Sequence, residues 1–127
     1  MNYSENNKFL IAQIGQDKIC IPISSVVEIA KGGVERTLPG SIDGFVDITR
    51  LRSSILGVLA LNNSFKPSSE MVVIKTAKTD IALLADQVQG IEELSINPEH
   101  IKSRGFYISN VDDYNILDVE SIGRALG

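Results

Sequence analysis

The sequence predicts a mainly β protein built from short strands and close turns. Apolar segments rich in Val and Ile recur along the 127-residue chain, and polar turns rich in Gly, Asn, Asp and Pro separate them. This pattern favours barrels or a sandwich over a parallel sheet with crossover helices. Hydrophobic residues make up 43% of the chain and Trp is absent, so we expect an aliphatic core within one domain or two very small lobes.

A β-hairpin is expected at the start of the fold. Residues 1–8 are polar and are expected to form a flexible N-terminus, so the single domain should span residues 9–127. Apolar residues predict strands over Phe9–Ile14 and Ile19–Ile21, and the polar, Gly-containing segment between them predicts the turn. Pro22 ends the second strand because proline has no N–H to donate to the ladder.

A short helix is expected next, over Val26–Ala30. Ser24 or Ser25 precedes it and suits the N-cap position, where a side-chain oxygen accepts a backbone N–H. Glu28 would lie in the early turns of this helix, where the helix dipole favours a carboxylate. A pair of glycines follows and should end the helix.

The most apolar segment of the chain, Leu51–Leu61, predicts a strand that is buried on both faces. Arg52 stands near its start, where the guanidinium can remain in water. A shorter strand is expected before this segment, over Phe45–Ile48. Residues 62–69 follow it and are rich in Asn, Ser and Pro, which predicts a loop.

A second β pair is predicted over Met71–Lys75 and Ile81–Ala85, joined by a polar turn. Asp86 follows this pair, and a carboxylate at the end of a buried strand typically accepts backbone N–H groups and so fixes a turn. The segment Val88–Leu94 predicts a further strand, which we expect to bend at Gly90.

The C-terminal part is expected to close with a hairpin and a helix. Strands are predicted over Phe106–Val111 and Ile116–Val119, around the polar segment 112–115. A helical turn is expected to begin at residues 97–99. Residues 120–127 have a helical pattern that places their apolar side chains on one face.

Composition argues against several classes of function. The formal net charge of −4 and the sequence pI of about 4.9 do not suit a general nucleic-acid binder, because such a protein presents a basic face. The single cysteine, Cys20, lies in an apolar segment and is expected to be a buried core residue, and one unpaired cysteine suits a reducing compartment. No signal-peptide pattern and no apolar segment of roughly 20 residues is present. We therefore expect a cytoplasmic protein without membrane insertion.

No catalytic, metal-binding or cofactor-binding constellation is evident in the sequence. The only histidine, His100, lies in a polar segment and is expected on the surface, without a Cys/His cluster beside it. Asp112 and Asp113 lack the alternating oxygen donors of a calcium loop and are expected in a solvated turn. The chain is therefore not expected to be an enzyme.

Glu28 and Arg52 are two charged residues in apolar neighbourhoods. The residues alone leave two interpretations open: unrelated surface charges, or an ion pair on the rim of an apolar groove. Such a pair contributes little to stability and more to the orientation of a partner.

Four segments, in this order, resemble the CheW-like family, the coupling proteins of bacterial chemosensory arrays. They are FLIAQIGQDKICIPISSVVEI, TLPG, LRSSILGVLAL and IALLADQVQGI, and the C-terminal YISNVDDYNILDVESI is similar to the closing hairpin and terminal helix of the family. The resemblance spans Phe9 to Leu126. It implies two small, interleaved, five-stranded SH3-like β-barrel lobes around a shared aliphatic core, with short helices that include a C-terminal one.

The resemblance also implies a non-enzymatic adaptor. Family members couple a CheA-type histidine kinase, through its regulatory domain, to the cytoplasmic tips of methyl-accepting chemoreceptors. By position, Glu28 and Arg52 match the polar pair of the family near the partner-binding surface. Val26 and Val88 match apolar positions that should line or support a receptor groove between the lobes.

The chain departs from the family pattern at Ser53, Gly57 and Ala60, where the pattern has Gly, Pro and Asp. This divergence suggests a specialised system, such as one that controls type IV pili and twitching. Two alternatives remain open. One is a CheW-like interaction module that binds another partner without array coupling. The other is a small-molecule-binding barrel, which would show a sizeable apolar pocket with convergent polar groups.

Overall fold

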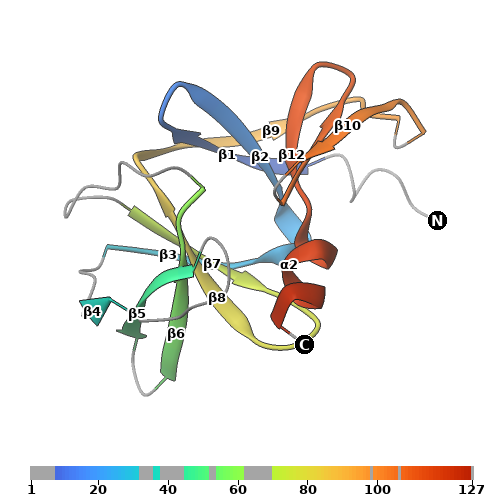
Figure 1. Cartoon of the computed structure of the whole chain (residues 1–127). Coiled ribbons are helices and arrows are strands. Elements are labelled where there is room, and N and C mark those ends of the chain that lie inside the picture. Colours follow the sequence, from blue (N-terminus) through green and yellow to red (C-terminus); the bar gives the residue numbers. More distant parts are fainter. Residues whose placement is uncertain are drawn as a thin grey trace.

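The residues that the structure describes form two β-sheets and a C-terminal helix (Figure 1). The computed structural model describes residues 8–31, 36–37, 45–51, 54–61, 70–97, 99–105 and 107–126. The prediction of a mainly β fold with a C-terminal helix is confirmed. The resemblance implied five strands for each lobe, and the described residues form two six-stranded sheets. Of the expected flexible terminus, Lys8 already belongs to the first strand, and residues 1–7 lie outside the described residues.

The two ends of the chain form the first sheet, and the middle of the chain forms the second. The first sheet has the order β10-β11-β12-β2-β1-β9, and the second has the order β3-β7-β8-β6-β5-β4. Strands of the first sheet are β1 (Lys8–Ile14), β2 (Asp17–Pro22), β9 (Gln87–Glu93), β10 (Ile101–Gly105), β11 (Ile108–Val111) and β12 (Tyr114–Leu117). Strands of the second are β3 (Val26–Lys31), β4 (Arg36–Thr37), β5 (Phe45–Leu51), β6 (Ser54–Leu59), β7 (Glu70–Lys75) and β8 (Asp80–Ala85). The 3-10 turn η1 (Ile23–Ser25) leads from the first sheet into the second, and the helix α2 (Val119–Leu126) ends the fold.

One aliphatic core is shared by both sheets, as the resemblance implied. We call it the inter-sheet core, and its members are Leu10, Ala12, Ile14, Ile19, Ile21, Leu59, Val72, Ile74, Ile81, Leu83, Ala85, Tyr107, Leu117 and Ile122. Helix α2 reaches this core through Ile122, which is fully buried, while Ala125 and Leu126 pack against it. The helical face expected near the C-terminus is therefore confirmed.

Each sheet also buries part of its other face. An outer cluster on the second sheet consists of Leu56, Val58, Ala60, Met71, Val73, Ala82 and Leu84. On the first sheet, Phe9, Ile11 and Cys20 form a smaller cluster. Successive residues of β1, β7 and β8 thus point into different clusters, which explains why these strands are almost entirely apolar.

The helix expected over Val26–Ala30 is wrong, because this segment forms strand β3. Its Val and Ile residues are β-branched and favour extended backbone. They also gain a partner, since β3 pairs antiparallel with the buried strand β7. The two serines that were expected to cap the helix lie in η1, which has no side-chain cap.

The single strand expected over Leu51–Leu61 is also wrong. Leu51 ends β5, Ser54 begins β6, and the two residues are paired in an antiparallel hairpin. Val58 and Leu59 are fully buried, but Ile55 is 63% exposed, so burial on both faces holds only for the second half of the segment.

The other predicted strands agree with the structure, with shifts of a few residues at their ends. Gly90 has φ 133°, and the register between β1 and β9 shifts beside it, so the expected bend is confirmed. Strand β10 was not predicted, because its sequence IKSRG is polar and mostly exposed. The loop expected over residues 62–69 lies outside the described residues.

Candidate functional site

The edge strand β9 of the first sheet approaches the second sheet at β7, the strand that pairs with the edge strand β3. Each of β3 and β9 is the last strand at one edge of its sheet. The Glu70 carboxylate on β7 accepts a hydrogen bond from the backbone N–H of Val88 on β9, with 3.2 Å between Oε1 and N. Glu70 is also the ladder partner of Lys31, the last residue of β3. One residue of β7 therefore contacts both the end of β3 and the start of β9.

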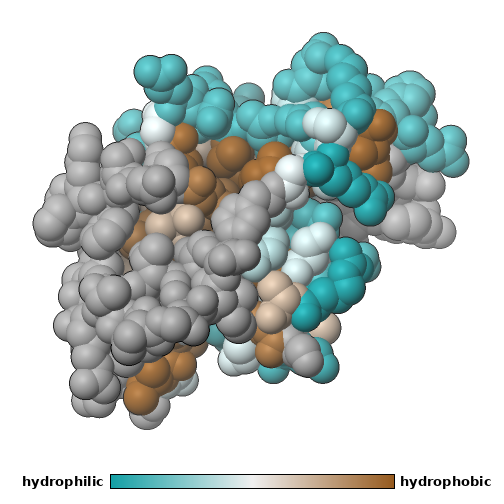
Figure 2. Space-filling view, viewed as in Figure 1, coloured by the Kyte–Doolittle hydropathy of each residue, from teal (hydrophilic) through white to brown (hydrophobic). Residues whose placement is uncertain are grey.

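Apolar side chains of these two strands remain exposed beside the inter-sheet core. Ile29 on β3 is 44% exposed and Ile91 on β9 is 60% exposed. Their ladder partners, Val72 and Leu10, belong to the inter-sheet core, so both isoleucines point to the side of their sheets that faces this core. On the face shown in Figure 2, apolar residues gather between the parts of the molecule that carry the two sheets.

Val26 and Val88, the two valines predicted for the site, are partly buried and pack against the inter-sheet core. Val26 is the ladder partner of Ile74, whereas the N–H of Val88 binds Glu70. Glu70 and Ile74, the β7 residues that these two valines contact or pair with, are four residues apart, which is about 13 Å along a strand that rises 3.3 Å per residue. The two valines therefore lie toward opposite ends of one strip, which we call the inter-sheet surface and define as Val26, Ile29, Val88 and Ile91.

Glu28 lies on the other face of β3. Val26 pairs with Ile74 but Glu28 pairs with Val73, so the register shifts by one residue at Val27. A β-bulge of this kind re-aims the side chains that follow it. Because Ile74 belongs to the inter-sheet core and Val73 to the outer cluster, the bulge sends Val26 and Glu28 to opposite sides. Sequence reasoning had placed both residues near a single partner surface.

Arg52 lies outside the described residues, so its pairing with Glu28 stays a prediction. Its neighbour Leu51 is described, and it packs against the outer cluster. Ala30, two residues after Glu28, packs against the same cluster. The side of the second sheet that carries Glu28 therefore also holds the end of β5 from which the chain continues to Arg52.

Ile29 and Ile91 were not predicted as site residues. Both were visible in the sequence as apolar residues, Ile29 in an expected helix and Ile91 in an expected strand, but an apolar residue in such an element is usually buried. Their exposure follows from the position of β3 and β9 at sheet edges, which the sequence does not show. Ile91 also follows the bend at Gly90, where the pairing of β9 with β1 changes register.

Cys20 and Asp86 have structural roles. Burial raises the pKa of the Cys20 thiol to about 11, with a further contribution from Glu92, so Cys20 is the inert core residue that was expected. The Asp86 carboxylate accepts the Gly15 N–H at 2.8 Å, which confirms its predicted role in fixing a turn.

The hairpin turn at Asp112 and Asp113 is solvated, as predicted, with φ values of 49° and 67°. The Asp112 carboxylate accepts the Asn97 backbone N–H at 3.0 Å and contacts His100 Nδ1 at 3.0 Å. The hydrogen bond from Asn97 and the contact with His100 lower the pKa of Asp112. Across the described residues, no group of His, Cys, Asp and Glu side chains could hold a metal ion. None of the described helices is long and apolar enough to span a bilayer.

Comparisons with known proteins agree with this architecture. A family model described as the CheW-like domain matches residues 8–124. The fold is similar to the crystal structure of the scaffolding protein TtCheW from Thermoanaerobacter tengcongensis, with a TM-score of 0.67. The two sequences are 17% identical, and the similarity covers 88% of this chain and 87% of that one. No curated protein matches the chain.

Proposed function

Because its sequence matches the family model over residues 8–124, the chain belongs to the CheW-like domain family, and we propose that it is a non-enzymatic adaptor of bacterial chemosensory signalling. It acts in the cytoplasm and holds a CheA-type histidine kinase at the cytoplasmic tips of methyl-accepting receptors. The observation that carries this proposal is the exposed apolar strip between the edge strands β3 and β9.

The inter-sheet surface is the proposed receptor contact. Ile29 and Ile91 both expose apolar area on the core-facing side of their sheets, and exposed apolar surface that gathers on one side is typical of protein interaction sites. Val26 and Val88 are partly buried and connect the inter-sheet surface to the inter-sheet core, because both pack against that core. A receptor segment with an apolar face would cover the two isoleucines.

The kinase contact is proposed at the strand edges that lie farthest from this surface. The first sheet ends in β10 and the second ends in β4. The outer edge of a terminal strand offers backbone N–H and C=O groups that can pair with a strand of another domain. Binding at two separate surfaces would raise the effective concentration of the kinase at the receptor tips.

A matched pair of substitutions tests the receptor contact. Ile91→Asp places a charge on the inter-sheet surface, and Ile55→Asp places the same charge at a residue of similar exposure, 63% against 60%. Ile55 is on β6, which β7 and β8 separate from β3 in the sheet. In pull-downs with receptor cytoplasmic fragments from the same organism, Ile91→Asp should lose binding and Ile55→Asp should keep it. Equal binding by both variants would contradict the assignment.

The polar pair is proposed to orient the partner. Arg52→Glu should weaken receptor or kinase binding while the melting temperature stays nearly unchanged, because an exposed ion pair contributes little to stability. Adding Glu28→Arg to this variant should restore part of the binding. Unfolding of Arg52→Glu would instead make Arg52 a structural residue.

The departures from the family pattern support a specialised pathway. Ala60 is buried at 8% exposure within the outer cluster, at the position where the family pattern has a carboxylate. We propose control of type IV pili as the output. A deletion strain should lose twitching while swimming stays normal, and the reverse result would assign the protein to flagellar chemotaxis.

A further inference from the structure

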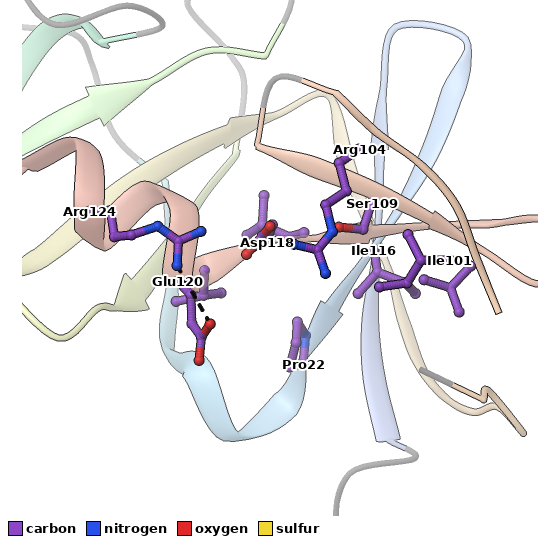
Figure 3. Close-up of a pocket in the computed structure, with 11 residues that line it drawn as sticks. Pro22, Ile101, Arg104, Ser109, Ile116, Asp118, Glu120 and Arg124 are labelled. Carbon is purple, nitrogen blue, oxygen red and sulfur yellow. Dashed lines mark ion pairs between the residues drawn. The ribbon is translucent and has the colours of Figure 1, made fainter. Parts of the chain in front are cut away.

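A pocket of about 340 Å³ lies between the strands β10 to β12 and the start of helix α2 (Figure 3). Pro22, Ile101, Ile116 and Val119 supply apolar walls. The pocket includes no residue of the inter-sheet surface. Its ability to bind a ligand therefore does not depend on the adaptor role proposed above.

Two polar side chains on one wall can bind an anion. Arg104 on β10 and Ser109 on β11 are ladder partners, so their side chains share a face. Only 8% of Ser109 is exposed, and the residue lines the pocket. No buried side-chain oxygen among the described residues lacks a hydrogen-bond partner, so the Ser109 hydroxyl is not an orphaned buried group. Arg104 makes no ion pair within the same part of the chain. A ligand oxygen within the pocket could accept hydrogen bonds from both groups.

The carboxylates of the pocket already have partners. Asp118 accepts the backbone N–H of Ser121 at 3.1 Å and its hydroxyl at 2.7 Å. Glu120 forms an ion pair with Arg124, with 3.8 Å between Oε2 and Nη1. Figure 3 shows this pair on the side of the pocket opposite Arg104. Of the two arginines that line the pocket, Arg104 is the one without a carboxylate partner among the described residues.

The two walls are fixed relative to each other. Tyr107, between β10 and β11, has φ 59°, a region that a bulky residue rarely adopts. Its side chain is buried in the inter-sheet core, and its carbonyl accepts the Asp118 N–H at 2.8 Å. This hydrogen bond joins the turn before Ser109 to the start of α2. Strained backbone of this kind persists where the surroundings hold it, and it often marks binding sites.

We propose that this pocket binds a monocarboxylate with a short, branched aliphatic chain. The Arg104 guanidinium would pair with the carboxylate, whose geometry it matches, and the Ser109 hydroxyl would donate a hydrogen bond to it. Ile101, Ile116 and Val119 would cover the aliphatic chain. A dianionic phosphate fits less well, because the carboxylates of Asp118 and Glu120 line the same pocket. This chemistry occurs in free carboxylic acids and in protein segments that place an aliphatic residue beside an acidic one.

Nuclear magnetic resonance titration of the full chain tests the proposal. The probes are 4-methylpentanoate, acetate, which lacks the aliphatic chain, and 4-methylpentanamide, which lacks the charge. We expect saturable shifts of the Ser109 and Val119 amides with 4-methylpentanoate, with the millimolar dissociation constant expected of so small a ligand. Arg104→Gln should weaken this binding about tenfold. Lys18→Gln is the matched control, since Lys18 lines a different pocket, and it should leave the binding unchanged.

Ser109→Ala provides a second test, because it removes only the hydroxyl and should weaken binding several-fold in a folded protein. Two further probes distinguish the sources of the ligand: capped Ala-Leu-Asp-Ala and its Leu→Ala analogue. Tighter binding of the first peptide than of 4-methylpentanoate identifies a protein segment, and the reverse identifies a free acid. Equal shifts with acetate or the amide, or full binding by Arg104→Gln, would overturn the proposal.

Discussion

Replacing Ile122 by Ala should destabilise the protein strongly, because this side chain is the fully buried contact of α2 with the core that both sheets share. Ile122 is fully buried in the inter-sheet core. Truncating a buried Ile to Ala costs about 2–5 kcal/mol, and the larger costs arise where the surroundings cannot collapse into the cavity. The two paired sheets around Ile122 resist such collapse, so we expect a loss of about 3–4 kcal/mol. For a domain of this size, that corresponds to a fall in melting temperature of roughly 10–15 °C.

Urea unfolding followed by far-ultraviolet circular dichroism measures this loss, since the chain has no Trp for fluorescence. Arg124→Ala is the matched control on the same helix, because the Arg124 side chain is 67% exposed. Its effect should stay within about 0.5 kcal/mol. A loss below about 1 kcal/mol for Ile122→Ala would refute the reasoning, since α2 would then contribute little to the inter-sheet core.

Three further predictions concern the ionisable groups. Asp86→Ala removes the acceptor of the Gly15 N–H and should lower the unfolding free energy by about 1 kcal/mol in urea titrations; an unchanged midpoint would show that the turn does not need this bond. Burial raises the pKa of Cys20 from 9.0 to about 11. Between these two pH values the unfolded chain releases the thiol proton and the folded protein keeps it, so the free energy of unfolding should fall as pH rises from 9 towards 11. Cys20→Ala should lose this part of the pH dependence, and a parallel decline in both proteins would contradict the assignment. The hydrogen bond from Asn97 lowers the pKa of Asp112, so its stabilisation is present above pH 3.8 and is lost as pH falls through the lower, folded-state pKa. The difference in urea midpoint between the wild type and Asp112→Asn should therefore shrink in acid, and a constant difference would exclude this cause.

Most strands could be predicted because their residues are apolar on both faces or alternate clearly. The segments that form β7 and β8 are short apolar runs bounded by polar turns, which is the pattern of a strand that is buried on both faces. Strand β10 escaped prediction because its only apolar residue is Ile101. It is a strand because its backbone pairs with β11, which is a property of the tertiary structure.

The candidate site was less predictable than the fold. The resemblance assigned Val26 and Glu28 to the site on a segment that was expected to be a helix, and even in a regular strand residues two positions apart share a face. The bulge at Val27 reverses that expectation, and a bulge has no reliable signature in a single sequence. The helix assigned to this segment failed for a related reason, since Ser24 and Ser25 are good cap residues but local capping is weaker than pairing with β7.

The interleaved order of the sheets has a consequence for synthesis. Strand β1 pairs with β9, so Leu10 meets its ladder partner only after Ile91 has been made. The described strands of the second sheet all lie between these two positions in sequence. On the ribosome, the hairpin of β1 and β2 must therefore wait with the edge of β1 unpaired while the second sheet can already assemble. Long-range pairing of this kind slows folding, and this early hairpin is the part of the nascent chain most in need of protection by a chaperone.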